Sequence, residues 1–212
     1  MMPRVLCLIV VLAGMSGLFW VCPLFRVVSL KKVESAKADA RFDPAEFATK
    51  FWDDQLTASL AQASDAREVL DAIDRDFPGA RNRFGRSVGI SDSFLVMLQG
   101  TGRVVEVNSK GVGLALLDAA DAPDVVLPVT MIFGNTVRDA TGRLNVSDFP
   151  NSQDFNAVST ELNRLVEARV LPQLRDRVEV GQEIQFVGCA EISHDTKRRK
   201  PQKIVPLRVE FR

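Results

Sequence analysis

Arg138 and Asp139 are the adjacent charged residues most suited to chemistry in this sequence, in the stretch 132–151 with the sequence IFGNTVRDATGRLNVSDFPN. Further polar residues lie at Asp148, Asn151, Gln153 and Asn163. An arginine fork and nearby amides could bind a polyol or a carboxylate. The same residue types serve turns, where an aspartate accepts backbone N–H groups. We favour the structural role for the pair and keep all six residues as candidate ligand-binding residues.

The elements around this pair are predicted to form a hairpin. Gly134 and Gly142 flank it, the run DATG is typical of a turn, and the stretch RLNVSDF at 143–149 has the composition of a strand. In that setting Asp139 would bind backbone N–H groups and tie the turn to the helix that begins near Asn151. The pair would then be architectural.

Residues for catalysis or metal binding are scarce. His194 is the one histidine, so a serine or cysteine nucleophile has no well-placed base. Cys189 is the one cysteine outside the apolar N-terminal segment and lies in the apolar run IQFVGCAEI, so we expect a small buried side chain there. No Cys/His spacing indicates a metal site. We therefore expect no catalytic residues, no metal, no cofactor and no enzymatic activity.

The segment Val5–Phe25 carries no charge and is long enough for a helix that crosses a membrane. Three interpretations stay open: an uncleaved signal anchor, a cleaved signal peptide, and a lipoprotein signal that ends at Cys22. Each of them predicts export. We expect the segment to hold the soluble part on the outer face of the cytoplasmic membrane.

The rest of the chain divides into a linker and an ectodomain. Residues 1–28 are the signal segment, 29–42 a polar linker, and 43–212 the periplasmic ectodomain, with a helical pair at 43–86. The helix starts are Asp43-Pro44 and Asp65, where an aspartate can cap the first turn. Pro78-Gly79 is expected to end the second helix. Because this pair is too small to fold alone, it should pack on the C-terminal part of the ectodomain.

Strand patterns dominate residues 94–212. A long run at 94–108 is interrupted by Gly100 and Gly102, which suggests a bulge, and further strands are expected at 112–118, 125–133, 183–192 and 203–211. A helix that begins at Asn151 or Ser152 separates the third strand from the fourth. This order predicts an α+β fold in which the two-helix unit packs on an OB-like small β-barrel.

Nucleic acid is not an expected partner. Lys+Arg and Asp+Glu balance at 27 each, so the chain has no net field to attract a polyanion. The loop HDTKRRKPQK at 194–203 is basic, but it lacks the aromatic residues on which single-stranded bases stack. A solvated loop is the simpler interpretation.

Several segments together resemble a known family. They are FDPAEFATKFWDD, GTGRVVEV, the stretch GNTVRDATGRLNVSDFPNSQDFNAVSTELN, GQEIQFVGCAEI and IVPLRVEF. They are similar to a bacterial family of predicted periplasmic lipoproteins of unknown function, often encoded beside sugar-uptake ABC transporters. Cys22 aligns with the family's lipidated cysteine, although Val21 replaces the small residue expected before it. The resemblance implies an envelope location and ABC-transporter components as partners.

We therefore expect a non-enzymatic, membrane-anchored accessory protein of the cell envelope. The alternative is a module that binds a small polyol or carboxylate through the block around Arg138.

Overall fold

The computed structural model describes residues 42–87, 92–116, 121–194 and 201–212. Its contacts divide the chain between Arg41 and Phe42, and all helices and strands of the described residues belong to the second unit. The predicted membrane segment at 5–25, Cys22 and the linker up to Arg41 lie outside the described residues. Among the described helices, none has the length and hydropathy that a membrane crossing requires.

The first helical stretch begins where the sequence predicts it. The Asp43 carboxylate accepts hydrogen bonds from the N–H groups of Ala45 and Glu46 at 2.8 and 3.1 Å, and Pro44 occupies the first turn. This stretch consists of four continuous pieces: α3 (Pro44–Phe51), a π-helical turn η1 (Trp52–Leu56), α4 (Thr57–Ser59) and a 3-10 turn η2 (Leu60–Gln62). The predicted apolar stripe is buried at Phe51, Trp52, Leu56 and Leu60.

The second predicted helix is divided in two. Helix α5 (Ala66–Arg75) starts at Asp65, whose carboxylate accepts the Glu68 N–H at 3.0 Å as expected. Pro78, however, does not end a helix. It lies in the first turn of α6 (Phe77–Phe84), where the missing N–H of a proline would have had no helical acceptor.

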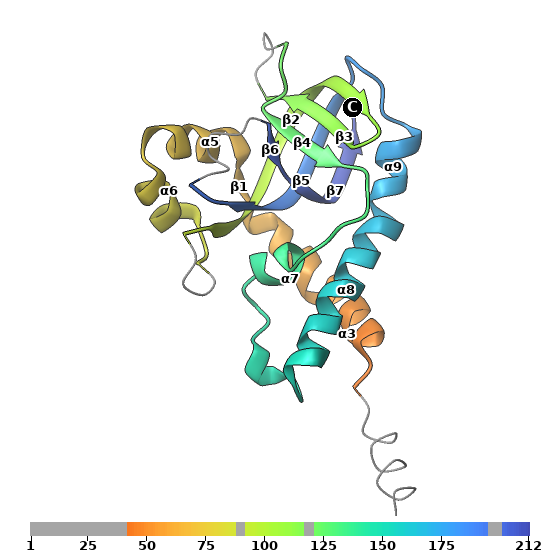
Figure 1. The fold of residues 1–212 in the computed structure, drawn as a ribbon. Helices are drawn as coiled ribbons and strands as arrows, with labels where there is room; N and C mark the ends of the chain where they lie inside the picture. Colours follow the sequence, from red (N-terminus) through yellow and green to blue (C-terminus); the bar gives the residue numbers. More distant parts are fainter. Residues whose placement is uncertain (1–41, 88–91, 117–120, 195–200) are drawn as a thin grey trace, which may run out of the picture. The chain divides into compact units, whose positions relative to one another are not determined.

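These helices pack in two different places, so the predicted two-helix unit is divided as well. Helix α3 lies against α8 (Ser152–Arg169), whereas α5 packs on α6 and on the strand β2 (Phe94–Asn108). Figure 1 shows α5 and α6 beside the sheet and α3 below it, next to α8. An ion pair of 2.6 Å between Asp53 and Arg169 joins η1 to α8.

One sheet contains every described strand. The strands are β1 (Ser64–Asp65), β2, β3 (Gly111–Ala115), β4 (Val125–Pro128), β5 (Glu183–Ile192), β6 (Gln202–Lys203) and β7 (Val205–Phe211). The order is β6-β4-β3-β2-β5-β7, with β1 paired to β2 off this path. The pairs β1–β2 and β4–β6 are parallel and the others antiparallel. The α+β class predicted from the sequence is confirmed.

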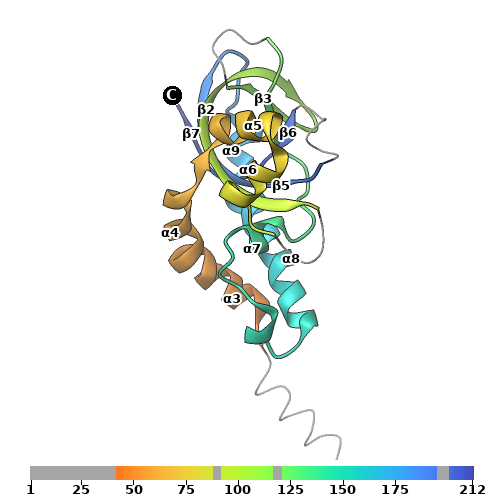
Figure 2. The same ribbon diagram turned by 90° about the vertical axis from the view of Figure 1, so that its left-hand side faces the viewer.

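The two edges of this sheet are joined by the chain itself. Strand β6 pairs with β4 and strand β7 pairs with β5, yet only Ile204 separates β6 from β7. The sheet therefore has to curl until both edges meet one extended stretch of chain, and Figure 2 shows this curl. The helical segment predicted between the third and fourth long strands consists of α8 and α9 (Leu171–Asp176).

Strand β2 serves both halves of the sheet, as expected. Residues 94–103 pair with β5, and residues 103–108 pair with β3. The bulge predicted at Gly100 and Gly102 is wrong, because pairing with β5 is regular there and the register shifts between Val104 and Glu106. At Gly102 a Cβ atom would lie 3.0 Å from the Ala115 carbonyl oxygen. The absence of a side chain at Gly102 therefore allows the backbone of β3 to approach β2 closely at this point.

The third strand is shorter than the pattern predicts. Strand β4 ends at Pro128, and residues 129–133 form no strand. A proline cannot donate a hydrogen bond to a sheet, which limits the continuation of the ladder. The apolar residues at 131–133 instead line a cavity together with residues of α8.

The burial of Cys189 in β5 gives a direct test of this fold. The side chain is fully buried, and the loss of hydration that the thiolate would suffer raises the pKa of the thiol to about 12. In a chain with Cys7→Ser and Cys22→Ser, we expect Cys189 to resist maleimide at mildly alkaline pH and to react at once after unfolding. Ser109→Cys, in an exposed turn, is the reactive control. Fast labelling of Cys189 in the folded chain would contradict the burial.

Candidate functional site

Arg138 and Asp139 lie in a short helix, α7 (Thr136–Ala140), so the predicted hairpin is wrong. Gly134 (φ 90°) and Gly142 (φ 61°) bracket this helix in backbone conformations that favour glycine. The stretch 143–149, predicted as a strand, contains the 3-10 turn η3 (Val146–Asp148). Local side-chain caps stabilise that turn, and they outweigh the strand propensity of its apolar residues.

The Arg138 guanidinium is buried and donates four hydrogen bonds. Its Nε and Nη2 donate to the two carboxylate oxygens of Asp139 at 2.6 and 3.0 Å. Its Nη1 donates to the Phe155 carbonyl oxygen at 3.3 Å and to the Asn156 Oδ1 at 3.1 Å. Its central carbon also lies 3.6 Å from the centre of the Phe155 ring. The side chains of Arg138 and Asp139 are 6% and 14% exposed.

These contacts favour the architectural role. The fork of Arg138 is neutralised by its neighbour in the chain, and its remaining bonds tie α7 to α8, the helix predicted as the anchor of this turn. Asp139 binds the guanidinium, where the sequence suggests backbone N–H groups. A carboxylate ligand would have to displace Asp139, at the cost of leaving a buried charge uncompensated.

Three of the other candidates lie away from any shared site. Asp148 closes a capping box, in which its carboxylate accepts the Asn145 N–H at 3.3 Å. Asn151 caps α8, with its Oδ1 accepting the Asp154 N–H at 2.9 Å. Gln153 is exposed in the first turn of α8. The structure therefore groups Arg138 with Asp139, and it assigns Asp148 and Asn151 to helix ends.

Asn163, the sixth candidate, lines a cavity of about 440 Å³ between α8 and the chain segment 131–135. Its side chain is 7% exposed, and its Nδ2 donates to the Gly134 carbonyl oxygen at 2.9 Å. We call this the α8 cavity. It is lined by Met131, Ile132, Phe133, Gly134, Asn135, Asn156, Ser159, Thr160, Asn163, Arg164 and Glu167.

Most of these lining residues are missed by sequence reasoning. A signal is present as a polar stripe on one face of α8, since Asn156, Ser159, Thr160 and Asn163 recur at the spacing of helical turns. The apolar face of the same helix is the stronger pattern and indicates core packing alone. The polar stripe beside it is where a cavity could be expected. Phe133 ends a stretch with the composition of a strand, so the sequence does not indicate that it lines a cavity.

Other chemically active groups are dispersed. The His194 ring packs edge-on against Phe77, with 5.5 Å between ring centres. In the part of the chain that the structure describes, no cluster of His, Cys, Asp and Glu side chains could hold a metal ion. The basic loop at 194–203 cannot be placed in this scheme, because residues 195–200 lie outside the described residues.

Removal of the Asp139 carboxylate tests the architectural role. Asp139→Ala leaves the buried Arg138 charge uncompensated, so we expect a loss of roughly 2–4 kcal/mol in the free energy of unfolding. For a chain of this size that loss lowers Tm by about 5–10 °C in thermal denaturation. The double variant Arg138→Met, Asp139→Asn should recover most of the loss, since it removes both charges.

The matched control is Arg208→Ala, which breaks an exposed ion pair of 3.5 Å with Glu210. Exposed pairs contribute little, and we expect a change within about 0.5 kcal/mol. A Tm for Asp139→Ala equal to that of the parent would show that the pair does not stabilise the fold.

Comparison with known proteins agrees with this architecture. A crystal structure of an OB-fold protein from Thermotoga maritima superposes with a TM-score of 0.73 at 30% sequence identity, over 81% of this chain and 99% of that one. The curled sheet thus has an OB-fold neighbour, as its strand order predicts. No curated protein matches the chain at a significant level of similarity.

The sequence matches a family over nearly its whole length. Residues 8–210 fit the family described as "Predicted periplasmic lipoprotein (DUF2291)". The match takes in most of the apolar N-terminal segment, the Arg138 block and all but the last residue of β7. The chain therefore belongs to this family of predicted periplasmic lipoproteins, which confirms the resemblance seen in the sequence.

Proposed function

We propose that the protein is a non-enzymatic accessory protein of the cell envelope, held at the membrane by residues 5–25 with its OB-like unit in the periplasm. The observation that carries this proposal is the continuous family match from residue 8 to residue 210, which joins the apolar segment and the folded unit in one predicted lipoprotein. The uncharged stretch Val5–Phe25 is long enough to act as an anchor.

The chemistry of the described residues supports a role without catalysis. The one described cysteine, Cys189, is buried with its pKa raised to about 12, so little thiolate forms at neutral pH. The Arg138 guanidinium is held by Asp139 and by α8. The His194 ring packs against Phe77 of α6. A reaction centre needs such groups to converge on one point, and these three have different partners.

The proposed partner is a sugar-uptake ABC transporter. This part of the proposal rests on the resemblance to a family whose members are often encoded beside such systems. Chemical crosslinking in cells, followed by purification of a tagged full-length chain, should recover the transporter's membrane subunit together with the protein. The same experiment with a tagged, unrelated lipoprotein is the control. Equal recovery in both would contradict a specific association.

A second candidate function is the binding of a small molecule. The observation that favours it is the α8 cavity, where a buried Asn163 and other uncharged polar side chains meet exposed apolar ones. Sites for small molecules have this mixture of apolar walls and a few placed polar groups. The cavity differs from the site predicted from the sequence, because it excludes Arg138 and Asp139.

Cell fractionation tests the proposed location. The full-length chain should sediment with membranes and be extracted only by detergent, because Val5–Phe25 is apolar throughout. The Cys22→Ser variant should still sediment with membranes if the segment is retained as a helical anchor. If Cys22 carries the lipid, the same variant loses a radiolabelled acyl chain. Recovery of the unchanged full-length chain in the soluble fraction would contradict anchoring in either form.

A further inference from the structure

We infer that the α8 cavity binds an uncharged, hydroxyl-rich molecule of the size of a monosaccharide or cyclic polyol. This inference rests on the second function proposed above, small-molecule binding, and names its site and ligand class. The cavity volume of about 440 Å³ falls within the range of small-molecule sites. Three features specify the ligand: an unpartnered hydroxyl, a set of neutral polar groups, and an exposed apolar lip.

Ser159 supplies the unpartnered hydroxyl. The residue lines the cavity and is 4% exposed; its Oγ is closed off from solvent and has no hydrogen-bond partner among the described residues, so a ligand would reach it after rotation of the side chain. A helical serine commonly bonds the carbonyl four residues earlier, here that of Phe155. That carbonyl already accepts Arg138 Nη1 at 3.3 Å in addition to its helical bond. The buried Arg138 thus leaves the Ser159 hydroxyl for another partner, and a buried hydroxyl without one is costly.

The neutral groups beside Ser159 are arranged to donate and to accept. The Asn156 Oδ1 is taken by Arg138, which leaves the Asn156 Nδ2 as a donor. The Asn163 Nδ2 is taken by the Gly134 carbonyl, which leaves the Asn163 Oδ1 as an acceptor. A ligand hydroxyl can match either group, because it both donates and accepts. A carboxylate could only accept, and the Asn163 Oδ1 would repel it.

The two charged residues of the lining are already engaged. Arg164 Nη1 donates to Glu161 Oε2 at 3.2 Å, and Glu167 Oε1 accepts the Ile132 N–H at 2.7 Å. Arg164 and Glu167 also cancel in formal charge within the cavity. An anionic ligand would therefore compete with Glu161 for Arg164 and would meet the negative charge of Glu167, so its desolvation would be poorly compensated.

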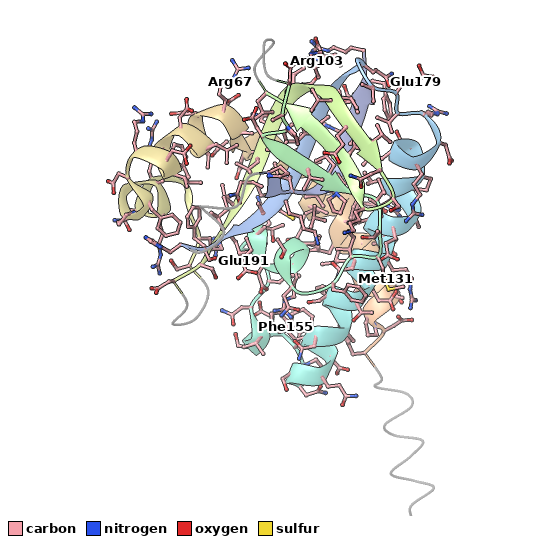
Figure 3. The ribbon with its side chains drawn as sticks, turned by 45° about the horizontal axis from the view of Figure 1, so that its top comes forward. Arg67, Arg103, Met131, Phe155, Glu179 and Glu191 are labelled. Carbon is pink, nitrogen blue, oxygen red and sulfur yellow. The ribbon has the colours of Figure 1, made fainter. Side chains whose placement is uncertain are left out.

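Exposed apolar side chains form the lip of the cavity, and hydrogen bonds hold the backbone of this segment in place. Phe133 and Met131 are 75% and 60% exposed, and Figure 3 shows Met131 beside α8. The chain is held on both sides of Phe133, by the Ile132 N–H on Glu167 and by the Gly134 carbonyl on Asn163. An aromatic ring kept exposed in this way can cover the C–H face of a sugar ring while the hydroxyls face the amides.

Calorimetric titration of the full-length chain in detergent tests the inference. The probes are D-glucose, D-galactose, D-ribose and myo-inositol, with D-glucuronate and D-galacturonate as the charged counterparts of the first two. We expect at least one neutral probe to bind, and the neutral hexoses to bind more tightly than their charged counterparts. Ser159→Ala should weaken the binding roughly two- to tenfold, as expected for one lost hydrogen bond. Phe133→Ser should also weaken it.

Matched variants separate lost binding from lost folding. Ser159→Ala should leave Tm unchanged or raise it, because no hydrogen bond is removed. Ser59→Ala should lower Tm, because the similarly buried Ser59 Oγ donates to the Gln55 carbonyl at 2.7 Å and accepts Arg143 Nε at 2.8 Å. Val180→Ser removes a hydrophobic side chain that is 65% exposed elsewhere, and should not affect binding.

Each contrary result has a distinct meaning. Tighter binding of the charged probes would overturn the ligand class and leave a binding function in place. Binding of a neutral probe that Ser159→Ala and Phe133→Ser leave unchanged would overturn the site. Absence of binding by every probe would overturn the inference, while the proposed membrane location would still be decided by fractionation.

Discussion

A guanidinium that is taken out of water needs both a counter-charge and hydrogen-bond acceptors, and Arg138 obtains them from two separate elements. Asp139 supplies the charge from within α7, and α8 supplies the Phe155 carbonyl and the Asn156 amide. The guanidinium also covers the Phe155 ring, which contacts Phe149 at 5.1 Å between ring centres. Phe149 in turn contacts Phe47 of α3. These contacts connect α3, α7 and α8 to one buried ion pair.

Different constraints set the arrangement of the strands and that of the helices. In the sheet, the single residue Ile204 between β6 and β7 requires the two edges to come together, so the curl results from chain connectivity. Among the helices no such covalent limit acts, and side-chain chemistry sets the arrangement. This division explains why an OB-like sheet could carry a cavity outside its barrel: the long connection between β4 and β5 brings its own polar and aromatic contacts.

The parts of the fold that could be predicted are those set by neighbours in the sequence. Asp43, Asp65 and Asn151 cap helices as their positions suggest, and the long strand at 94–108 serves both halves of the sheet. Two of the failures concern residues whose partners are distant. The segment 129–133 has strand composition, but Glu167 and Asn163 hold it against α8. The sequence around Arg138 and Asp139 has the pattern of a turn. It does not reveal the hydrogen bonds from Arg138 to Phe155 and Asn156, which lie 17 and 18 residues further along the chain. For the same reason only Asn163 of the six candidates lines the cavity.

The π-helical turn at Trp52–Leu56 has a consequence for chain length. A π turn holds one residue more than an α-helical turn, so it is equivalent to an insertion accommodated within a continuous helix. Loss of one residue there, with a return to regular α-helical winding, would leave α3 and α4 in nearly the same relative orientation, because a π turn takes up its extra residue locally. Phe47 would then keep its contact with Phe149. We therefore expect relatives one residue shorter between Asp43 and Leu60 to keep this packing, with a regular α-helix in place of the π turn.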